Sequence, residues 1–190
     1  MKTRNIILAI SLFLPGFLSA GELKQATFAA GCFWCMEAIY ERVPGVTKVV
    51  SGYSGGKEKD PTYEQVGSGN TGHCEAIQIT YDADKTSYTK LLEVFWKSHD
   101  PTNGRGVAPD FGKQYRSALF YRTPEEKSEI EKSQATVEKR LGKKVATQIA
   151  SFEKFYPAED YHQDYVKKHP ENSYVKNVSI PRLIEAGFKP

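Results

Sequence analysis

The chain has 190 residues, of which 26 are Lys or Arg, 23 are Asp or Glu and three are Cys, and its formal net charge is +3. This small charge excess excludes the strongly basic surface of a nucleic-acid-binding protein, and three cysteines are too few for a small disulfide-stapled scaffold. Because their number is odd, the simplest arrangement is one cysteine pair and one free thiol.

The first 20 residues have the three regions of a secretory signal peptide. Lys2 and Arg4 precede an apolar run over residues 6–18, and small residues follow that run. The run is shorter than the roughly 20 apolar residues that span a bilayer. We therefore predict removal of residues 1–20, export to the periplasm or out of the cell, and no stable membrane anchor. Residues 21–190 have the length of one catalytic domain.

Hydrophobic periodicity predicts two similar strand–helix–strand units. In the first unit, a strand over residues 25–30 leads to a helix that begins near Cys32 and ends at Pro44, and a strand over residues 46–53 follows. A glycine-rich loop over residues 55–72 connects the two units. A loop of this length is expected to be either functional or disordered.

The second unit is predicted from the same signals, and it comprises a strand over residues 74–81, a helix over residues 88–96, a strand over residues 115–121, a charged helix over residues 124–141 and a short strand over residues 145–150. Thr123 and Glu126 have the spacing of a capping box before the charged helix. An aromatic tail follows, which contains Phe152, Phe155, Tyr156, Tyr161 and Tyr165. The pattern predicts an α+β fold, a two-layer sandwich of split βαβ (ferredoxin-like) type with extra helices and long loops.

Cys32 is the first candidate nucleophile because it lies at the start of a predicted helix. The free N–H groups and the positive end of the helix dipole at such a position stabilise a thiolate, which is the form that attacks. Gly31 permits a sharp turn before it. Phe33 and Trp34 place two aromatic faces beside the thiol, where a small apolar group could bind.

Glu75 is a candidate proton donor. Strand alternation puts Glu75, Ile77 and Ile79 on one face and Cys74 on the other. If the isoleucines face the core, the carboxyl group lies at a partly dry rim, where its pKa is raised as a general acid requires. The competing interpretation is an edge-strand glutamate in water, which is more common for a single residue at a strand end.

Four blocks of sequence together resemble the A type of peptide methionine sulfoxide reductase (the MsrA family), and they are Gly31-Cys32-Phe33-Trp34 with Glu37, residues 63–75, Asp110 with residues 114–117, and residues 158–163. The resemblance implies roles for seven residues. It makes Cys32 the nucleophile, Phe33 and Trp34 the wall that receives the methyl group, and Glu75 the proton donor to the sulfoxide oxygen. It also implies that Tyr63, Asp110 and Tyr115 are supporting hydrogen-bonding residues.

The resemblance further implies reduction of methionine S-sulfoxide, free or in proteins, by an enzyme that repairs oxidised proteins and needs no cofactor. A hydrogen-bonded sulfoxide is electrophilic, so the thiolate of Cys32 attacks it and becomes a sulfenic acid. A second thiol then forms a disulfide, which a thioredoxin-like reductant reopens. We expect a monomer.

The resolving thiol departs from the common family pattern, because no cysteine follows Cys74 near the C-terminus. Cys35 is the favoured candidate, since the Cys-x-x-Cys spacing lets it meet Cys32 across one helical turn. Cys74 is the alternative, although it faces away from Glu75 in a regular strand. Direct resolution by an external thiol is the third possibility.

The four histidines lack the spacing of a metal site, and Cys35 is not followed by the His of a haem-attachment motif, so we expect neither metal nor haem. Two other functions remain open. A thioredoxin-like disulfide oxidoreductase would also carry Cys-x-x-Cys at a strand–helix junction. A non-catalytic module could instead bind a peptide through the aromatic cluster. Turnover of a sulfoxide distinguishes the reductase from both.

Overall fold

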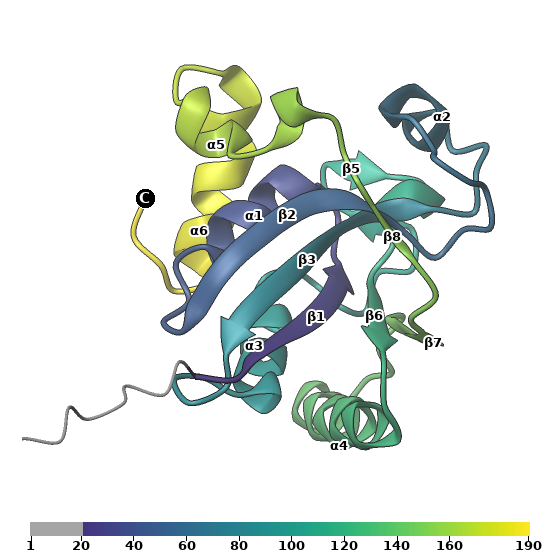
Figure 1. The fold of residues 1–190 in the computed structure, drawn as a ribbon, viewed down its shortest axis with the longest axis vertical. Helices are drawn as coiled ribbons and strands as arrows, with labels where there is room; N and C mark the ends of the chain where they lie inside the picture. The colour runs from purple at the N-terminus through teal and green to yellow at the C-terminus, as the bar shows by residue number, and fades with distance from the viewer. Residues whose placement is uncertain (1–20) are drawn as a thin grey trace, which may run out of the picture.

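The computed structural model describes residues 21–190 and has a curled, six-stranded mixed sheet (Figure 1). The strands are β1 (Leu23–Ala29), β2 (Val46–Ser54), β3 (Cys74–Asp82), β6 (Ala118–Tyr121), β7 (Gln148–Ser151) and β8 (Phe155–Pro157), in the spatial order β7-β6-β1-β3-β2-β8. β3 lies between β1 and β2 and is antiparallel to both, while β7 is parallel to β6. The predicted signal peptide, residues 1–20, lies outside the described residues.

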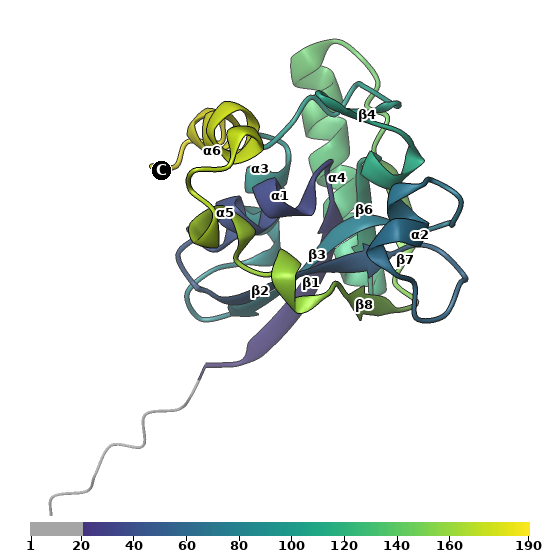
Figure 2. The ribbon, with the colours of Figure 1, turned by 90° about the horizontal axis from the view of Figure 1, so that it is seen from above.

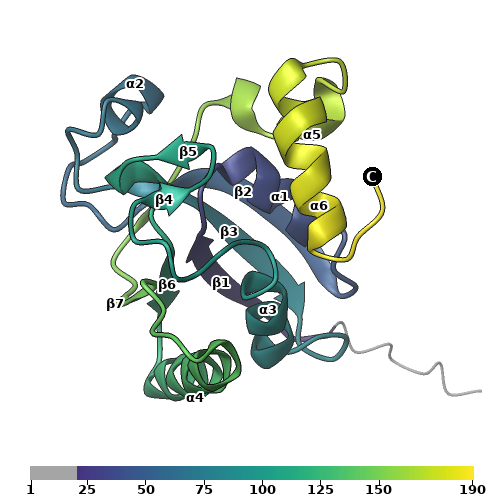
Figure 3. The ribbon, with the colours of Figure 1, turned by 180° about the vertical axis from the view of Figure 1, so that it is seen from behind.

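Helices α1 (Phe33–Tyr40), α3 (Tyr88–Phe95) and α6 (Ile180–Glu185) lie on one side of the sheet, which faces the viewer in Figure 3. The remaining elements are α2 (Tyr63–Gly67), the hairpin β4 (Gly106–Val107) and β5 (Asp110–Phe111), α4 (Pro124–Leu141), α5 (Tyr165–Lys168), the 3₁₀ turns η1 (Lys113–Tyr115) and η2 (Asp160–His162), and the π-helical turn η3 (Val175–Ser179). Within residues 21–190, none of these helices has both the length and the apolar composition to cross a bilayer.

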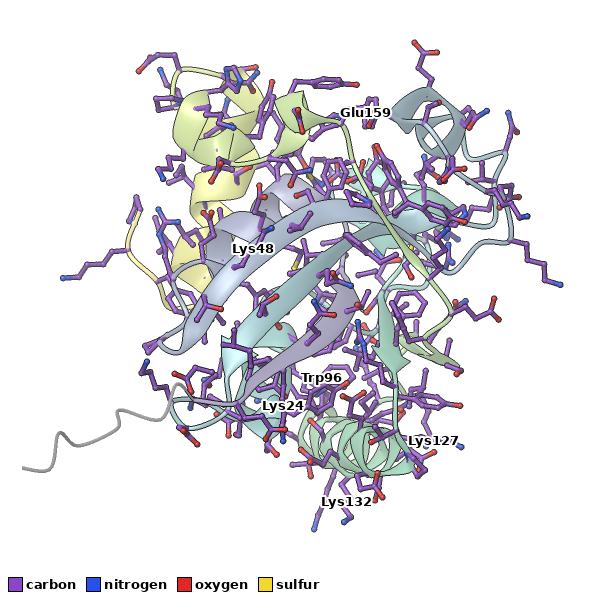
Figure 4. The ribbon with its side chains drawn as sticks, viewed as in Figure 1. Lys24, Lys48, Trp96, Lys127, Lys132 and Glu159 are labelled. Atoms are coloured by element: carbon purple, nitrogen blue, oxygen red, sulfur yellow. The ribbon has the colours of Figure 1, made fainter. Side chains whose placement is uncertain are left out.

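The main core lies between the sheet and these helices. Phe28 of β1 is fully buried there and meets the rings of Tyr40, Tyr88 and Phe95 edge-on, at centroid distances of 5.6 to 5.9 Å. Trp96, at the end of α3, donates its indole N–H to Ser133 of α4 at 2.6 Å, and Figure 4 labels this tryptophan close to α4. Rigid aromatic packing of this kind fixes α1, and with it the turn that precedes α1.

The alternation predicted for β3 is confirmed. Ile77 and Ile79 are buried in the main core, whereas Cys74 and Ala76 belong to a smaller apolar cluster on the opposite face of the sheet. This arrangement decides which side chains of β3 can reach the start of α1, and Glu75 shares the face of the isoleucines.

The mixed α+β class and most predicted elements are confirmed, including α4, which ends at Gly142 with a φ of +64°. The capping box before α4 is only half formed: the Thr123 hydroxyl accepts the Glu126 N–H at 3.2 Å, but the Glu126 carboxylate accepts the N–H of Arg122. The helix is therefore capped by Thr123 and by the acidic residues of its first turn.

Three predicted segments differ in extent. Residues 55–72 are not wholly irregular, because Thr62 and Gln65 form a reciprocal capping box that starts α2. The strand predicted over residues 115–121 begins only at Ala118, since the chain first makes the 3₁₀ turn η1. The aromatic tail contributes β8, which pairs with β2 and was not predicted.

Candidate active site

Cys32 lies in the turn between β1 and α1, as predicted, and is 5% exposed. The preceding Gly31 has a φ of +76°, and a Cβ at this position would lie 2.7 Å from the Cβ of Val107. Only glycine combines this backbone conformation with this close approach. The turn therefore packs Gly31 against Val107 of β4, and the adjacent Cys32 is buried rather than in open solvent.

The ionisation of Cys32 corrects the expectation from its helix position. Burial is the largest influence and raises its pKa well above the ordinary value, and its contact with Cys35 acts in the same direction. The first free N–H of α1, that of Phe33, is donated to Glu75 at 2.9 Å. Burial therefore outweighs the helix dipole at this thiol in the reduced protein.

Cys35 carries the more acidic thiol of the pair. Its hydrogen bond with Cys32 is the largest cause that lowers its pKa, and the charge of Arg182 and the hydroxyl of Ser179 lower it further, to about 7 against the opposing effect of burial. The two adjacent thiols thus lose one proton readily and the second with difficulty, because two thiolates in contact repel each other.

Glu75 is 3% exposed, so the interpretation of a solvated edge-strand glutamate is wrong. It lies on a central strand, and its Oε2 accepts the Phe33 N–H. Desolvation is the main cause that raises its pKa to about 8, and the Phe33 bond only partly offsets this effect. The carboxyl group is therefore protonated near neutral pH and is fixed to the residue next to Cys32, as a general acid requires.

An aromatic wall, defined as Phe33, Trp34, Tyr63 and His162, surrounds the start of α1. The ring centroid of Phe33 lies 6.3 Å from that of Trp34, 6.4 Å from that of Tyr63 and 5.0 Å from that of His162. Tyr165 covers the far face of Trp34, with the two rings stacked at 3.7 Å. The wall offers apolar faces that suit a methyl group.

Of the three predicted supporting residues, Tyr63 belongs to this wall, and Asp110 and Tyr115 lie near enough to interact with Tyr63 electrostatically. After burial, which is the largest cause, the charge of Glu75 raises the pKa of Tyr63 to about 12 and also raises that of Tyr115. Asp110 and Cys32 act on both tyrosines in the same direction. Both hydroxyl groups therefore stay protonated and can donate hydrogen bonds in the same electrostatic environment as Glu75.

Glu159, from the sequence block at residues 158–163, fixes Tyr63 in place. Its carboxylate accepts the backbone N–H of Tyr63 at 3.0 Å and the hydroxyl of Tyr53 at 2.8 Å. Figure 4 labels Glu159 near α2, although Glu159 is 96 residues from Tyr63 in the sequence and 106 residues from Tyr53. The sequence block was recognised, but the contacts that explain it depend on the tertiary structure.

The C-terminal segment supplies residues that sequence reasoning missed. Figure 2 shows α5 and α6 on one side of α1 and α2 on the other. The carboxylate of Asp110 accepts the Tyr174 hydroxyl at 2.6 Å and lies 3.2 Å from Nη2 of Arg182. Tyr174 also reaches the Cys32 thiol. No periodicity or spacing in the sequence indicated these residues, because each contact joins segments that are more than 60 residues apart.

Cys74 faces the other side of the sheet, and burial raises the pKa of its thiol to about 11. Its Sγ lies 3.5 Å from the carbonyl oxygen of Ser54. Cys35, and not Cys74, therefore adjoins Cys32. Among residues 21–190, no group of three or more His, Cys, Asp or Glu side chains is placed to hold a metal ion.

His162 is expected to hold Trp34 in the aromatic wall. The indole N–H of Trp34 donates to Nδ1 of His162 at 3.1 Å, and burial lowers the pKa of this histidine, so it remains neutral and an acceptor. His162→Phe should lower the free energy of unfolding by about 1 kcal/mol, because the indole loses its partner. Urea denaturation measures this loss. His162→Asn, which retains an acceptor near Nδ1, is the control and should be less destabilised; equal losses would contradict the role of the hydrogen bond.

Comparison with known proteins gives a consistent result. Residues 24–186 match the family model described as peptide methionine sulfoxide reductase. A curated protein of Leptospira borgpetersenii, named peptide methionine sulfoxide reductase MsrA, is 44% identical over 170 residues, which are 88% of this chain and 97% of that protein.

Two solved structures of Mxr1 from Saccharomyces cerevisiae are also similar. The reduced form is 34% identical, has a TM-score of 0.75, and the match covers 79% of this chain and 87% of that one. The structure of Mxr1 in complex with Trx2 is 26% identical with a TM-score of 0.54, and the match covers 75% of this chain and 84% of that one.

Proposed function

The chain belongs to the peptide methionine sulfoxide reductase family of thiol-dependent oxidoreductases, and on this premise we propose that Cys32 is its nucleophile and Glu75 its proton donor. The observation that carries the proposal is the bond from the Phe33 N–H to Glu75, which ties a protonated carboxyl group to the residue after the nucleophile. This membership replaces the thioredoxin-like disulfide oxidoreductase and the non-catalytic peptide-binding module as interpretations.

The reaction begins with binding of the sulfoxide against the aromatic wall. Glu75 gives a hydrogen bond and then its proton to the sulfoxide oxygen, which makes the sulfur electrophilic. A proton shift from Cys32 to Cys35 within their hydrogen bond moves the negative charge of the pair to Cys32, which attacks. The substrate loses its S–O bond and is reduced to methionine, while Cys32 gains the oxygen and becomes a sulfenic acid.

The supporting residues follow from the same geometry. Tyr63 and Tyr115 are protonated donors in the electrostatic environment of Glu75, and we infer that they hydrogen-bond the sulfoxide oxygen as charge develops on it. Phe33 and Trp34 receive the methyl group. Asp110, which binds Tyr174, keeps that hydroxyl oriented beside Cys32.

The second step proposed is a disulfide between Cys32 and Cys35, with a thioredoxin-like protein as the external reductant. The position of Cys35 beside Cys32 and the orientation of Cys74 towards Ser54 support this choice of resolving thiol. The complex of Mxr1 with Trx2 supports the choice of reductant, because a similar fold is known to associate with that partner. The disulfide would be reopened by thiol exchange.

The site should consume only one epimer of methionine sulfoxide, and the family indicates the S form. The three substituents of the chiral sulfur have three different positions. The methyl group contacts Phe33 and Trp34, the oxygen contacts Glu75, and the remaining chain points out of the site. Chromatography of a racemic sulfoxide peptide during turnover tests this result. A Glu75→Gln sample serves as the control for chemical loss, and equal consumption of both epimers would remove the three-point argument.

We also infer a split βαβ core. The support is that α1 connects the parallel strands β1 and β2 with β3 between them, and that β6 after α3 lies beside β1. We further propose that residues 1–20 are removed and that the single domain acts as an exported monomer, in the periplasm or outside the cell. Its substrates there would be methionine sulfoxide in oxidised proteins and the free amino acid.

A further inference from the structure

Cys35 has a hydroxyl partner from the C-terminal segment. Cys35 is 1% exposed, and its Sγ lies 3.3 Å from the Oγ of Ser179. Ser179 is the last residue of η3 and is also 1% exposed. A hydroxyl at this distance can donate to a thiolate as well as accept from a thiol. The contact is therefore compatible with both protonation states of Cys35, unlike the contact of Cys74 with the Ser54 carbonyl, which accepts only.

Arg182 of α6 brings a positive charge to the same place. It is 7% exposed, and its Nη2 donates to the carbonyls of Val107 and Ala108 and lies 3.2 Å from Oδ2 of Asp110. Its Nη1 is buried without a hydrogen-bond partner among the described residues. A Cβ on Gly31 would lie 3.3 Å from Nη1, so this nitrogen faces the turn that carries the two thiols.

A buried guanidinium nitrogen without a partner is costly unless a negative charge is nearby. Asp110 accepts a hydrogen bond from Nη2 of Arg182, and the positive charge of Arg182 lowers the pKa of Cys35. The other titratable groups around the thiol pair are Glu75 from β3, Asp110 from β5 and Tyr174 before η3. Among these groups only Arg182 is positive, so it is the one whose charge favours ionisation of Cys35, in addition to the hydrogen bonds from Cys32 and Ser179.

We propose that Arg182 and Ser179 are positioning residues for the resolving step, and that they hold Cys35 as the thiolate that attacks the Cys32 sulfenic acid. The inference rests on the proposed function, in which Cys32 carries that sulfenic acid. An S–S bond forms between the two cysteines, the S–O bond of Cys32 breaks, and the hydroxyl group of the sulfenic acid takes up one proton and leaves as water. Cys35 is oxidised and the Cys32 sulfur is reduced.

The first test measures the ionisation of Cys35 without any reaction. Thiolate absorbance near 240 nm is recorded against pH in Cys32→Ser/Cys74→Ala protein, in which serine retains a hydroxyl donor to Cys35. Adding Arg182→Met should raise the midpoint of Cys35 ionisation by about one pH unit or more, because methionine removes the positive charge. Arg182→Lys should raise it by less, because lysine keeps a positive charge. Arg122→Met is the matched control, since this half-buried arginine contacts Thr27 and Phe152 and should leave the midpoint unchanged.

The second test follows the resolving step itself. Hydrogen peroxide oxidises the thiol pair in Cys74→Ala protein, and rapid quenching followed by peptide mapping with mass spectrometry separates the Cys32 sulfenic acid, trapped by dimedone, from a Cys35 sulfenic acid and from the disulfide. Arg182→Met should slow disulfide formation about threefold or more near pH 6 and little near pH 9, because the lost thiolate is restored at high pH. Ser179→Ala should give a smaller shift in the same direction.

An unchanged midpoint and pH profile in folded Arg182→Met would overturn the proposal. If this variant does not fold, the same result in Ser179→Ala would overturn it, because removal of one hydroxyl leaves the packing in place. Peroxide generates the sulfenic acid without a methionine sulfoxide, so this test of the resolving step does not depend on sulfoxide reduction. A protein that fails to reduce sulfoxides would contradict the proposed function, and the peroxide test would still decide the roles of Arg182 and Ser179.

Discussion

Cys32→Ser is expected to abolish reduction of methionine sulfoxide, whereas Cys35→Ser should still reduce about one sulfoxide per enzyme molecule when no thiol is added. The nucleophile acts before the resolving thiol, so removal of Cys35 leaves the first oxygen transfer possible and stops the cycle at the sulfenic acid. The methionine formed per enzyme molecule, measured by chromatography after rapid quenching, distinguishes the two variants. Dimedone labelling of Cys32 should accompany the single turnover of Cys35→Ser.

Cys74→Ser is the matched control, because it also removes a buried thiol, but one on the opposite face of the sheet. It should recycle with a thioredoxin-like reductant as the unmodified protein does. A Cys35→Ser enzyme that recycles normally with thioredoxin would instead move the resolving role to Cys74 or to the reductant. Full activity of Cys32→Ser would remove the proposed nucleophile altogether.

Glu75→Gln should lower the single-turnover rate about a hundredfold or more and change substrate affinity little, because glutamine keeps a donor but cannot give up its proton in the transition state. Stopped-flow measurement of the first turnover gives the rate, and equilibrium titration with a sulfoxide peptide in the Cys32→Ser background gives the affinity. A near-normal rate would make Glu75 a structural residue and shift the acid role to Tyr63 or Tyr115.

The pH dependence gives an independent signature of the same residue. The rate should rise as pH passes about 7, where the pair of thiols loses its first proton, and fall as pH passes about 8, where Glu75 loses the proton that it must donate. The profile is then bell-shaped, and only its basic limb should disappear in Glu75→Gln.

Glu37→Gln is the control for this profile. Glu37 is as buried as Glu75, at 3% exposed, and burial raises its pKa to about 8 as well, but its carboxylate binds the backbone of Asp164 and Tyr165. The basic limb should therefore remain in Glu37→Gln. Loss of the limb in both variants would show that it reports the titration of buried carboxyl groups in general.

Local physical rules were enough to predict from the sequence where α1 begins and which face of β3 carries Glu75. The change from a strand pattern to a helix pattern at Gly31 placed Cys32 at a helix start, and two-residue alternation placed Glu75 on the core face of β3. Thr123 and Gly142 set the ends of α4 in the same way. These features depend on residues within a few positions of each other, so the sequence by itself determined them.

Only the tertiary structure decided how those residues ionise. Whether Glu75 is solvated or dry depends on the strands beside it, and β3 is central because β1 and β2 pair with its two edges. Burial of Cys32 likewise reverses the effect expected from the helix start. The pKa of a buried group follows from everything packed around it, and strand periodicity contains no information about those neighbours.

The same reason explains the residues that sequence reasoning missed. Ser179 and Arg182 reach Cys35 only because η3 and α6 fold back onto α1, more than 140 residues later in the chain. Neither residue belongs to a motif with a fixed spacing from the thiols. The sequence alone thus determined the positions of Cys32 and Glu75 within their elements and the order of the elements, whereas long-range packing decided which charges and hydroxyl groups surround the two cysteines.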